Sequence, residues 1–417
     1  MNIYLESIGC KLNQSEIETL ARRFVARGHQ VVATPQEADL CVLNSCAVTH
    51  IAARKSRQAA RRMRRHNPSA RLVITGCYAQ VAPDDLQADL IVGNANKDRL
   101  VERLLGPSSL RASSLPSFSP SLLPQHRTRA FVKIQDGCDN HCTYCITCIA
   151  RGPQKSRPRA EVLAEIQAWV EAGYNEIVLT GVHIGGYGRD HGEPPRDSLW
   201  RLVEAILDQT GVRRLRLSSV EPWEVTPDVF ELWKDPRLCR HLHLPLQSGS
   251  DEILRRMGRG YTTANFVRLA EVARAAIPEL AITTDIIVGF PGETAAHFAK
   301  SLSFVESMSF ARGHVFPYSA RPGTPAALLP DRVPSFEKKA RAARMRAIVR
   351  QATTQFQAQF VGQIVEVLWE NRRNGQWRGL TDNYLRVTAQ SDDNLAQAIT
   401  PVQLTALTHE GLYGIPL

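Results

Sequence analysis

The stretch FVKIQDGCDNHCTYCITCIARG, residues 131–152, decides the fold of this chain. It opens with a short apolar run at residues 131–134, of the kind that forms a buried strand, and passes at once into a loop that carries Cys138, Cys142 and Cys145. A loop with reactive side chains directly after a buried strand is typical of parallel β/α barrels, whose sites lie at the carboxyl ends of their strands. We therefore expect a barrel or partial barrel to begin here.

Six strand–helix units support that expectation. Candidate strands fall at residues 131–134, 176–180, 214–217, 241–246, 281–288 and 314–318. Segments with helical periodicity lie between them, at residues 160–172, 199–209, 266–276 and 296–308. The predicted fold class is α/β, with a partial (β/α)6 TIM-like barrel over residues 130–350.

The loop cysteines suggest an iron–sulfur site. Three thiolates on one tight loop can bind three irons of a [4Fe–4S] cluster and leave the fourth iron without a protein ligand. S-adenosylmethionine (SAM) can chelate such an open iron, and an electron passed to its sulfonium releases a 5′-deoxyadenosyl radical. Zinc is the alternative, because Cys142, Cys145 and Cys148 repeat the CxxC spacing of structural zinc sites. A zinc ribbon needs a second ligand pair on another loop, and the barrel offers no convincing pair, so the sequence favours the open cluster.

The first hundred residues predict a second α/β unit with a parallel sheet. Strands are expected at residues 2–9, 40–45, 71–76 and 89–92, and helices at residues 15–27 and 52–66. Cys10, Cys46 and Cys77 each follow directly after one of these strands. Because loops at the carboxyl ends of parallel strands converge at one edge, the three cysteines could hold a second cluster. Three independent core cysteines are the alternative, and the pattern alone does not separate the two.

Cysteine usage and hydropathy indicate a cytosolic protein. Nine cysteines are an odd number in a long chain whose first residues read as a strand and not as a signal peptide, which argues against a disulfide framework. No stretch approaches the ~20 consecutive apolar residues of a membrane helix. Cys41, inside an apolar strand, and Cys239, at the end of a helix, are expected to be packing residues.

The charge distribution predicts a polyanionic partner. The net charge of +10 fits a solvated basic face equally well when taken alone. Basic residues gather, however, in one predicted helix and just after the loop cysteines: Arg54, Lys55, Arg57, Arg61, Arg62, Arg64 and Arg65, then Arg151, Lys155, Arg157 and Arg159. Basic side chains beside a chemical site suggest that the substrate itself is the anion.

Composition also marks the domain boundaries. Residues 106–129 are rich in Ser and Pro and predict a linker between an N-terminal domain, residues 1–105, and the barrel. A basic helix is expected at residues 335–360. Residues 363–417 then break into short strands separated by Asn, Gly and Asp turns, which predicts a small β-barrel of the kind that binds RNA, in a C-terminal module at residues 351–417.

These motifs together resemble the tRNA methylthiotransferases of the radical SAM superfamily. SIGCKLNQSE, NSCAVT and TGCYAQ resemble the N-terminal methylthiotransferase domain, QDGCDNHCTYC with Ala150-Arg151-Gly152 resembles the radical SAM core, and the last sixty or so residues resemble the TRAM domain. LTGVHIGGYG, RLRLSSVEP and LHLPLQSGS are most similar to the MtaB-type branch, which acts on N6-threonylcarbamoyladenosine at position 37 of tRNA. Rival branches act on isopentenyladenosine in tRNA or on an aspartate of a ribosomal protein.

The resemblance implies two [4Fe–4S] clusters and SAM as cofactors, with Cys10, Cys46 and Cys77 as ligands of the auxiliary cluster. One SAM would methylate a sulfur at that cluster, and a second would be cleaved at the cluster of Cys138, Cys142 and Cys145. The resulting radical would replace the unactivated C2 hydrogen of adenine by a methylthio group. The base would come from the tRNA anticodon loop, where it can be splayed out at modest cost.

The resemblance also implies partners for the protein, and two alternatives to a two-cluster enzyme stay open. An electron donor and a sulfur source are required besides tRNA, and the family implies a monomer. One alternative is a radical SAM enzyme with a single cluster. Another, of a different class, is a non-catalytic zinc protein that binds RNA through its basic faces.

Residues near the strand ends complete the predicted site. The resemblance places Tyr144 near the SAM adenine. Strand-end positions that could bind SAM or substrate are Thr180, Gly181, Gly185, Gly186, Ser218, Ser219, Glu221, Gln247 and Ser248. For each of them a structural hydrogen bond at a turn is an equal alternative, and the run GFPGE at residues 289–293 is expected to shape the site as a turn. The chain departs from the family where Cys148 replaces a usual proline and His141 a usual aromatic residue.

Overall fold

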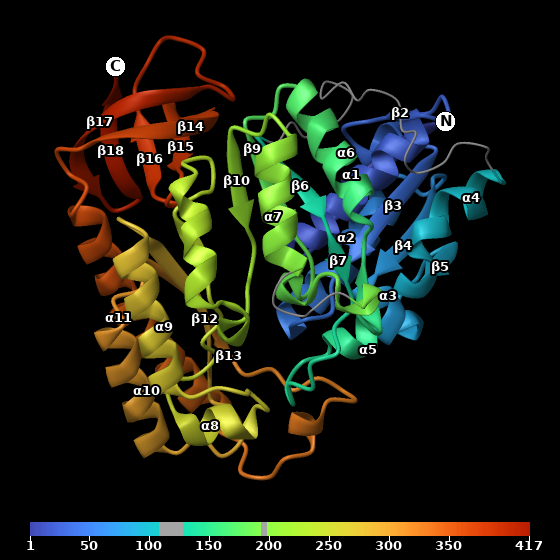
Figure 1. Ribbon diagram of the computed structural model, residues 1–417. Helices are drawn as coiled ribbons and strands as arrows, with labels where there is room; N and C mark the ends of the chain where they lie inside the picture. Colours follow the sequence, from blue (N-terminus) through green and yellow to red (C-terminus); the bar gives the residue numbers. More distant parts are fainter. Residues whose placement is uncertain (108–127, 193–197) are drawn as a thin grey trace.

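The computed structural model describes residues 1–107, 128–192 and 198–417. Three units follow one another along the chain: an N-terminal sheet, a half-barrel and a C-terminal β-barrel (Figure 1). The predicted α/β fold class with its final small β-barrel is confirmed. Most of the expected linker, residues 108–127, lies outside the described residues.

The N-terminal unit is a five-stranded sheet in the order β2-β1-β3-β4-β5, and all its strand pairs are parallel. Its elements are β1 (Asn2–Ser7), α1 (Lys11–Val25), β2 (Gln30–Val31), β3 (Leu40–Ser45), α2 (His50–His66), β4 (Arg71–Gly76), α3 (Cys77–Val81), β5 (Leu90–Val92), η3 (Asn94–Arg99) and α4 (Leu100–Leu105). The central strand β3 is buried along its whole length, as a strand covered on both faces should be.

Helix α1 begins earlier than the sequence pattern predicts. The periodicity suggested a start at Ser15, whereas the helix starts at Lys11, one residue after Cys10. Gly9 makes the early start possible, since its φ of +115° turns the chain sharply as soon as β1 ends. Cys10 is extended and occupies the N-cap position, so it lies at the carboxyl edge of the sheet.

The middle of the chain forms a half-barrel of six parallel strands. Two three-stranded sheets, β10-β9-β6 and β11-β12-β13, are joined by single bridges between Leu215 and Leu238 and between Ser219 and His243. Its main elements are β6 (Arg129–Lys133), α5 (Thr147–Arg151), α6 (Arg159–Glu171), β9 (Glu176–Thr180), α7 (Ser198–Gln209), β10 (Arg214–Leu217), β11 (His241–His243), α8 (Asp251–Arg256), α9 (Thr263–Ala276), β12 (Ala281–Val288), α10 (Ala295–Ser307) and β13 (Arg312–Pro317). A small hairpin, β7 (Gln135–Asp136) with β8 (Lys155–Ser156), encloses the cysteine loop.

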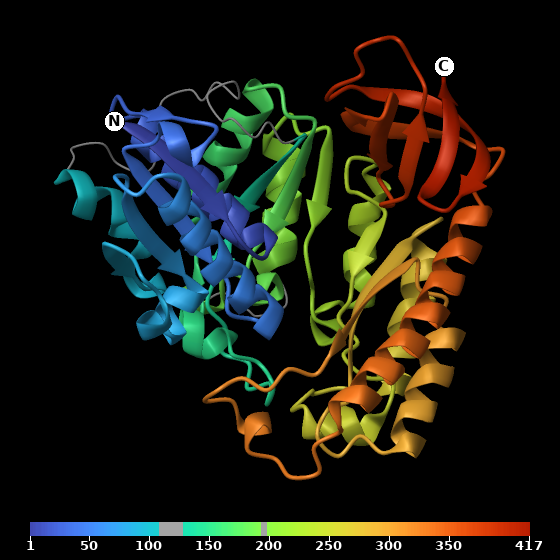
Figure 2. The same ribbon diagram turned by 180° about the vertical axis from the view of Figure 1, so that it is seen from behind.

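Helix α11 (Ser335–Ala358) connects the half-barrel to the C-terminal unit. It covers the outer side of β13, where its Val349 lies 3.2 Å from the position of a Cβ on Gly313 (Figure 2). A closed barrel of five strands follows in the order β14-β15-β16-β18-β17. These strands are β14 (Ile364–Arg373), β15 (Gln376–Thr381), β16 (Arg386–Ala389), β17 (Ile399–Thr408) and β18 (Gly411–Pro416), and they enclose a core around Trp369.

The C-terminal barrel is attached to the amino ends of the half-barrel strands (Figure 1). Arg216 of β10 is fully buried and forms an ion pair with Glu176 at 2.7 Å. The same guanidinium donates to the carbonyl oxygens of Asp382 at 2.7 Å and Thr381 at 3.1 Å in the C-terminal barrel. Arg240 adds an ion pair with Asp382 at 2.6 Å. In the described part of the chain, no helix is both long and apolar enough to cross a membrane.

Candidate active site

The loop after β6 holds the first cysteine trio, Cys138, Cys142 and Cys145, at the carboxyl end of the half-barrel. The Cys138 N–H donates to the Gly152 carbonyl at 3.1 Å, which closes the loop around α5. The sulfurs of Cys138 and Cys145 accept N–H groups of residues 140 and 147, each at 3.4 Å. Because these hydrogen bonds favour the charged thiolate, the loop suits metal ligation.

A second segment holds this loop in place from the far side of the barrel. The Thr143 N–H donates to the Met257 carbonyl at 3.0 Å, and its hydroxyl donates to the Arg256 carbonyl at 2.8 Å. Gly258 follows with a φ of +71°, and a Cβ there would lie 3.0 Å from the His141 carbonyl oxygen. The loop is therefore fixed by main-chain contacts that a larger residue at position 258 would disturb.

The electrostatics of this trio fit a metal cluster. Burial raises the pKa of Cys138 to about 12, and the neighbouring thiols of Cys148, Cys145 and Cys142 act in the same direction. The thiols of this loop therefore lie close enough together to affect the pKa of Cys138. Cysteine binds iron as the thiolate, so the release of thiol protons couples cluster assembly to pH.

Cys148 differs from the other loop cysteines. Its Sγ donates to the Asn140 carbonyl oxygen at 3.1 Å, a contact that needs the protonated thiol. The sulfurs of Cys138 and Cys145 instead accept hydrogen bonds. The ligand set without Cys148 stays a prediction, which metal analysis of a Cys148 variant tests.

The second trio, Cys10, Cys46 and Cys77, comes together at the carboxyl edge of the N-terminal sheet. A Cβ on Gly9 would lie 2.9 Å from the Cys46 sulfur, so this glycine lets the Cys10 loop approach Cys46 closely. Burial raises the pKa of Cys46 to about 12, and the thiols of Cys77 and Cys10 raise it further. Three residues far apart in sequence therefore present their thiols to one another.

Both donor sets consist of three soft thiols, which are the ligands that iron–sulfur clusters prefer. Within the described ranges, no three His, Cys, Asp or Glu side chains converge on a position that could hold a single metal ion. The thiolates of a four-iron cluster bind separate irons and so stand apart from one another.

A buried ion cluster lies between the two trios. Glu16 of α1 accepts from Lys97 at 2.6 Å, Lys133 at 3.4 Å and Arg151 at 2.9 Å. Arg151 also pairs with Asp136 at 2.8 Å. Burial by itself would raise the pKa of Glu16, but Lys97 and Arg151 hold it well below its usual range. Three cations meet two carboxylates, so this cluster carries one positive charge in excess.

Hydrogen bonds of two asparagines connect the region of the ion cluster to the second trio. Arg151 donates to Asn13 Oδ1 at 2.6 Å, and the same oxygen accepts from the Cys10 thiol at 3.8 Å. Asn94 donates to the Cys77 sulfur at 3.6 Å and to the Ala150 carbonyl at 2.6 Å. Helix α5, which ends the first cysteine loop, is thus hydrogen-bonded to side chains that contact the second trio.

The structure corrects the role expected for two of the basic residues after the cysteine loop. Arg151 was expected to face an anionic substrate, but its side chain is only 2% exposed and its charge is used by Glu16 and Asp136. Arg157 likewise pairs with Glu165 at 2.5 Å. Both side chains stabilise the protein internally and leave no free charge for a ligand.

The basic helix α2 divides into two sets of residues. Arg57, Arg62 and Arg64 are engaged with Tyr78, Glu6 and Asp89, respectively. The remaining basic side chains are exposed and, within the described part of the chain, have no ion pair: Arg54, Lys55, Arg61 and Arg65. The second set is available to bind an anionic partner.

Residues after β9 build the wall beside the first cysteine trio. The Thr180 carbonyl accepts from the Ile134 N–H, and a Cβ on Gly181 would lie 3.0 Å from the Gln135 carbonyl oxygen. Gly185 and Gly186 are similarly crowded, since Cβ atoms there would lie 1.7 Å from an oxygen of Glu224 and 2.2 Å from one of Gln154. These glycines permit close packing of the wall, and a role in binding SAM or substrate stays a prediction.

Residues after β10 and β11 reach the same end of the half-barrel. Ser218, Ser219 and Glu221 are partly exposed there, and Ser248 is fully buried. Gln247 has a left-handed φ of 65° and is held by main-chain hydrogen bonds to residues 285 and 287 of β12. A non-glycine residue in that conformation is strained, which is common at functional sites.

Arg259 is a site residue that the sequence patterns did not reveal. Its guanidinium is 1% exposed, forms an ion pair with Glu221 and lies 3.5 Å from the Cys142 sulfur. Arg259 also stacks on Trp223, with its Cζ 4.7 Å from the ring centroid. It follows no motif, and only the three-dimensional fold brings it to the cysteine loop.

Two further residues or segments from the sequence analysis lie near the cysteine loop or shape this end of the half-barrel. Tyr144, in the cysteine loop, is partly buried, and burial raises the pKa of its hydroxyl well above the usual value. Its position near the SAM adenine stays a prediction. The run at residues 289–293 is a turn, in which the Gly289 N–H donates to Glu293 at 2.6 Å and Glu293 pairs with Arg341 at 2.6 Å.

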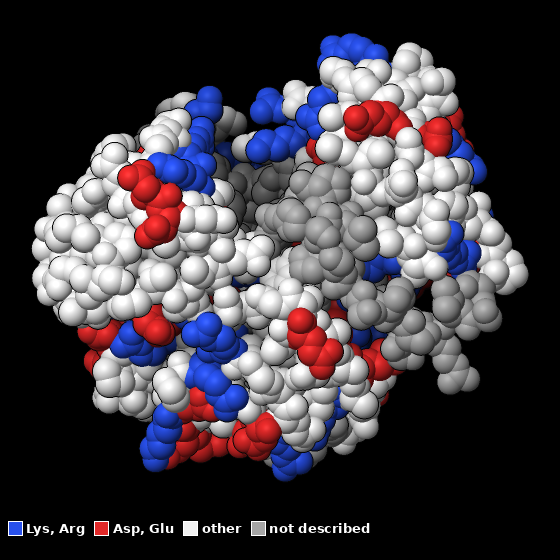
Figure 3. Space-filling view, turned by 90° about the horizontal axis from the view of Figure 1, so that it is seen from above, with Lys and Arg blue, Asp and Glu red and all other residues white. Residues whose placement is uncertain are grey.

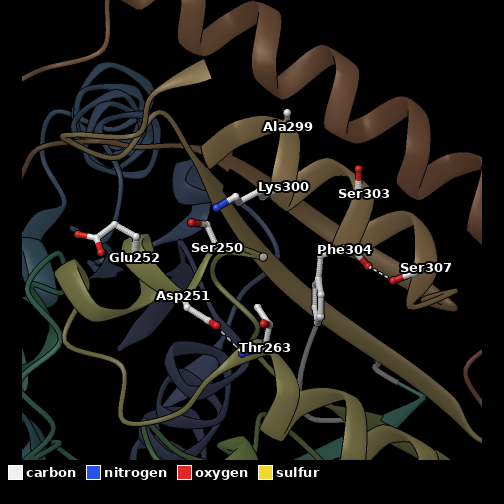
Figure 4. Close-up of a pocket in the computed structure, with 10 residues that line it drawn as sticks. Ser250, Asp251, Glu252, Thr263, Ala299, Lys300, Ser303, Phe304 and Ser307 are labelled. Carbon is white, nitrogen blue, oxygen red and sulfur yellow. Dashed lines mark hydrogen bonds between the residues drawn. The ribbon is translucent and has the colours of Figure 1, made fainter. Parts of the chain in front are cut away.

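A pocket on the outer side of the half-barrel is separate from this site. It lies between the start of α8 and α10, and its lining includes Ser250, Asp251, Lys300 and Phe304 (Figure 4). Asp251 accepts the Thr263 N–H at 2.7 Å and so serves the start of α9. The lining contains no cysteine.

Comparison with known proteins identifies related families and folds. Residues 132–305 match the model of the radical SAM superfamily, and residues 2–93 match the model described as uncharacterized protein family UPF0004. The structure also resembles the radical SAM methyltransferase TsrM from Kitasatospora setae with cobalamin and a [4Fe–4S] cluster bound. That likeness has a TM-score of 0.55 at 13% identity and covers 78% of this chain and 77% of TsrM, so it concerns the fold alone.

Similar sequences span almost the entire chain. The threonylcarbamoyladenosine tRNA methylthiotransferase MtaB of Bacillus subtilis is 36% identical and covers 96% of this chain and 93% of its own length. The protein of the same name from Thermotoga maritima is 38% identical, with 88% and 86% covered. The tRNA-2-methylthio-N(6)-dimethylallyladenosine synthase of Syntrophotalea carbinolica is 33% identical, with 97% of each chain covered.

Proposed function

The chain belongs to the radical SAM tRNA methylthiotransferase family, and from that premise we propose that it adds a methylthio group to C2 of N6-threonylcarbamoyladenosine at position 37 of tRNA. Relatives named for this substrate are 34–38% identical to the chain. Relatives named for dimethylallyladenosine are 32–35% identical, so the substrate assignment needs its own experiment.

One observation supports the proposal: the chain has two separate cysteine trios, and Arg151, at the end of the first cysteine loop, is hydrogen-bonded to Glu16 and to Asn13 beside Cys10 of the second trio. When bound, a [4Fe–4S] cluster on the loop trio supplies the electron that cleaves SAM, and a second on the N-terminal trio supplies a site for the transferred sulfur. The chain's own part is to fix both ligand sets. Asn13 and Asn94 do so by hydrogen bonds that span the boundary between them.

The tRNA would be held by basic surfaces outside this centre. Arg54, Arg61 and Arg65 share one exposed face of α2, close in sequence to Cys46. Figure 3 shows Lys and Arg side chains on both sides of the hollow between the C-terminal barrel and the N-terminal sheet. These side chains would neutralise phosphates, and binding should therefore weaken steeply as salt is added.

Analysis of tRNA nucleosides from a strain that lacks the gene tests the substrate assignment. Loss of the 2-methylthio form of threonylcarbamoyladenosine is the expected result. An unchanged nucleoside profile would contradict the proposal. Loss of the methylthio form of isopentenyladenosine would instead assign the chain to the dimethylallyladenosine branch.

Metal analysis of protein purified without oxygen tests the cofactors. Two four-iron clusters predict a brown protein with about eight irons per chain. About four irons would support the single-cluster alternative. A colourless protein that carries zinc would support the non-catalytic alternative.

A further inference from the structure

Several side chains that point into the half-barrel are polar or charged. Strand β13 shows which face this is, because Gly313 and Val315 point outward against the residues of α11. The alternate residues Arg312, His314 and Phe316 therefore point into the half-barrel. Phe316 is 40% exposed, so this part of the interior is open to solvent. A β/α barrel without an internal ligand is instead filled by packed apolar side chains.

Polar residues of the neighbouring strands line the same interior and mostly satisfy one another. His243 of β11, Thr283 of β12 and Arg312 of β13 are aligned in register. The Thr283 hydroxyl is 2.9 Å from a ring nitrogen of His243, whose other nitrogen lies 3.4 Å from Asp285. The histidine, the threonine and the aspartate thus use their polar atoms within the protein.

Two cations in this region have no ion-pair partner. Within the described ranges, neither the Lys11 ammonium nor the Arg312 guanidinium has an ion pair or a hydrogen bond. The Lys11 ammonium lies over the face of Tyr384, with Nζ 5.9 Å from the ring centroid. The neighbouring Arg216 and Arg129, in contrast, are paired with Glu176 and Glu370.

A chain of contacts connects Lys11 to Arg312, although they belong to different units. Lys11 lies over the ring of Tyr384, and the ring of His241 is stacked on Tyr384 at 4.7 Å. His241 is in turn 2.9 Å from the hydroxyl of Thr283, which is the register partner of Arg312. Burial is the main cause that lowers the pKa of His314, and both Arg312 and Lys11 lower it further, against an opposing effect of Asp285. The pKa of His241 is lowered well below its usual value by burial, and Arg216, Lys11, His243 and Arg312 add to that effect. Lys11 also directly follows Cys10, so an anion bound here would lie beside the second cysteine trio.

We propose that Lys11 and Arg312 form a carboxylate-binding subsite that receives the threonyl carboxylate of the substrate base. This inference rests on the proposed function, because that substrate carries a carboxylate at the end of its N6 substituent. The isopentenyl group of the rival substrate is apolar and would leave both cations unpaired. A partly buried cation without a partner destabilises such a complex, so the subsite selects for the charged substituent.

The test uses the reconstituted holoenzyme and anticodon stem–loop RNAs that differ only at one group. One RNA carries threonylcarbamoyladenosine, and a second carries the same base with its carboxylate converted to a neutral amide. We expect the unaltered enzyme to prefer the acid over the amide by about 10- to 100-fold in kcat/KM, as for the loss of a charged hydrogen-bonded pair. Arg312→Met and Lys11→Met should each reduce that preference to near one, mainly by losing activity on the acid.

Conservative and distant variants serve as controls. Arg312→Lys and Lys11→Arg keep the charge and should retain most of the preference. Lys234→Met removes an exposed lysine far from the interior and should leave the kinetics unchanged. Because Lys11 is next to Cys10, iron content is measured for every variant, and Arg312→Met provides the same test away from the cysteines. Equilibrium binding of the two RNAs, measured by fluorescence anisotropy without turnover, should show the same ratios.

The possible outcomes distinguish failure of the proposed function from failure of the proposed subsite. If the unaltered enzyme does not modify the acid RNA at all, the proposed function fails. If it does, but both Met variants keep the full preference for the acid, the subsite is refuted. If the variants lose activity equally on acid and amide, the cations bind a backbone phosphate of the RNA and the carboxylate assignment is again wrong.

Discussion

The two cysteine trios are built in opposite ways. Cys138, Cys142 and Cys145 lie on one short loop, so their spacing is set by neighbouring residues in the chain. Cys10, Cys46 and Cys77 come from the ends of β1, β3 and β4, and only the parallel sheet brings them together. A motif on one short loop can thus be recognised from the amino-acid sequence. A site built from residues far apart in the chain can be recognised only once the topology is known.

Loss of the local trio should have the largest effect. Cys142→Ala removes one of three ligands, so the loop should no longer hold a cluster, and formation of 5′-deoxyadenosine should fall to background. Iron content should drop by about half, because the N-terminal trio is unaffected. Cys239→Ala removes a buried cysteine of the same unit and should leave iron unchanged. SAM cleavage that survives in Cys142→Ala would contradict the assignment of this loop.

Loss of the assembled trio should separate two activities. Cys46→Ala should abolish methylthiolation and halve the iron content, while SAM cleavage at the loop trio continues. Product and 5′-deoxyadenosine are quantified in the same reaction. Cys41→Ala is the matched control, since Cys41 is buried in β3 only five positions away and is expected to bind no metal. Unchanged iron in Cys46→Ala would show that these cysteines are independent core residues.

The ion cluster between the trios should matter for stability. Arg151→Met removes the buried hydrogen bonds that Arg151 donates to Glu16, Asp136 and Asn13, which should lower the free energy of unfolding by about 3–5 kcal/mol. The folded-state pKa of Glu16 is depressed, so its stabilising contribution is present above the ordinary carboxyl pKa and is lost as pH falls through the depressed value. The difference between the variant and the unaltered protein should therefore shrink in acid.

Urea unfolding at neutral and acidic pH measures this effect. Arg255→Met, which breaks an exposed ion pair on α8, is the control and should leave the free energy of unfolding almost unchanged. A loss in Arg151→Met no larger than in the control would show that the ion cluster does not stabilise the contact between the two units.

The smallest effect is expected at Cys148. Its thiol donates to the Asn140 carbonyl, and that hydrogen bond is worth about 1 kcal/mol or less. Cys148→Ala should keep both the iron content and the rate of SAM cleavage within about twofold. Metal analysis after anaerobic reconstitution checks this expectation, and a clear loss of iron would make Cys148 a ligand.

Much of the fold followed from local patterns, because strands that are buried on both faces and amphipathic helices leave distinct signatures. The half-barrel, the N-terminal parallel sheet and the final β-barrel were predicted in this way. The start of α1 was placed too late, since the turn at Gly9 that allows an early start depends on a backbone conformation and leaves no periodicity.

The site was less predictable where partners are distant. Arg151 was grouped with substrate-facing residues because it follows the cysteine loop, yet its partners Glu16 and Asn13 are more than a hundred residues earlier in the chain. Arg259 and Asn94 have no motif around them, and their roles come from what the fold places beside them. A sequence pattern records the neighbours of a residue along the chain and not its neighbours in space.

The attachment of the C-terminal barrel has a consequence for how this protein can vary. Arg214 and Arg216 bind that barrel through carbonyl oxygens of Leu380, Thr381, Asp382 and Glu366, and every residue type offers such an oxygen. Substitutions in those segments can therefore leave these hydrogen bonds intact. The sequence of the barrel can thus change while its orientation on the half-barrel is kept.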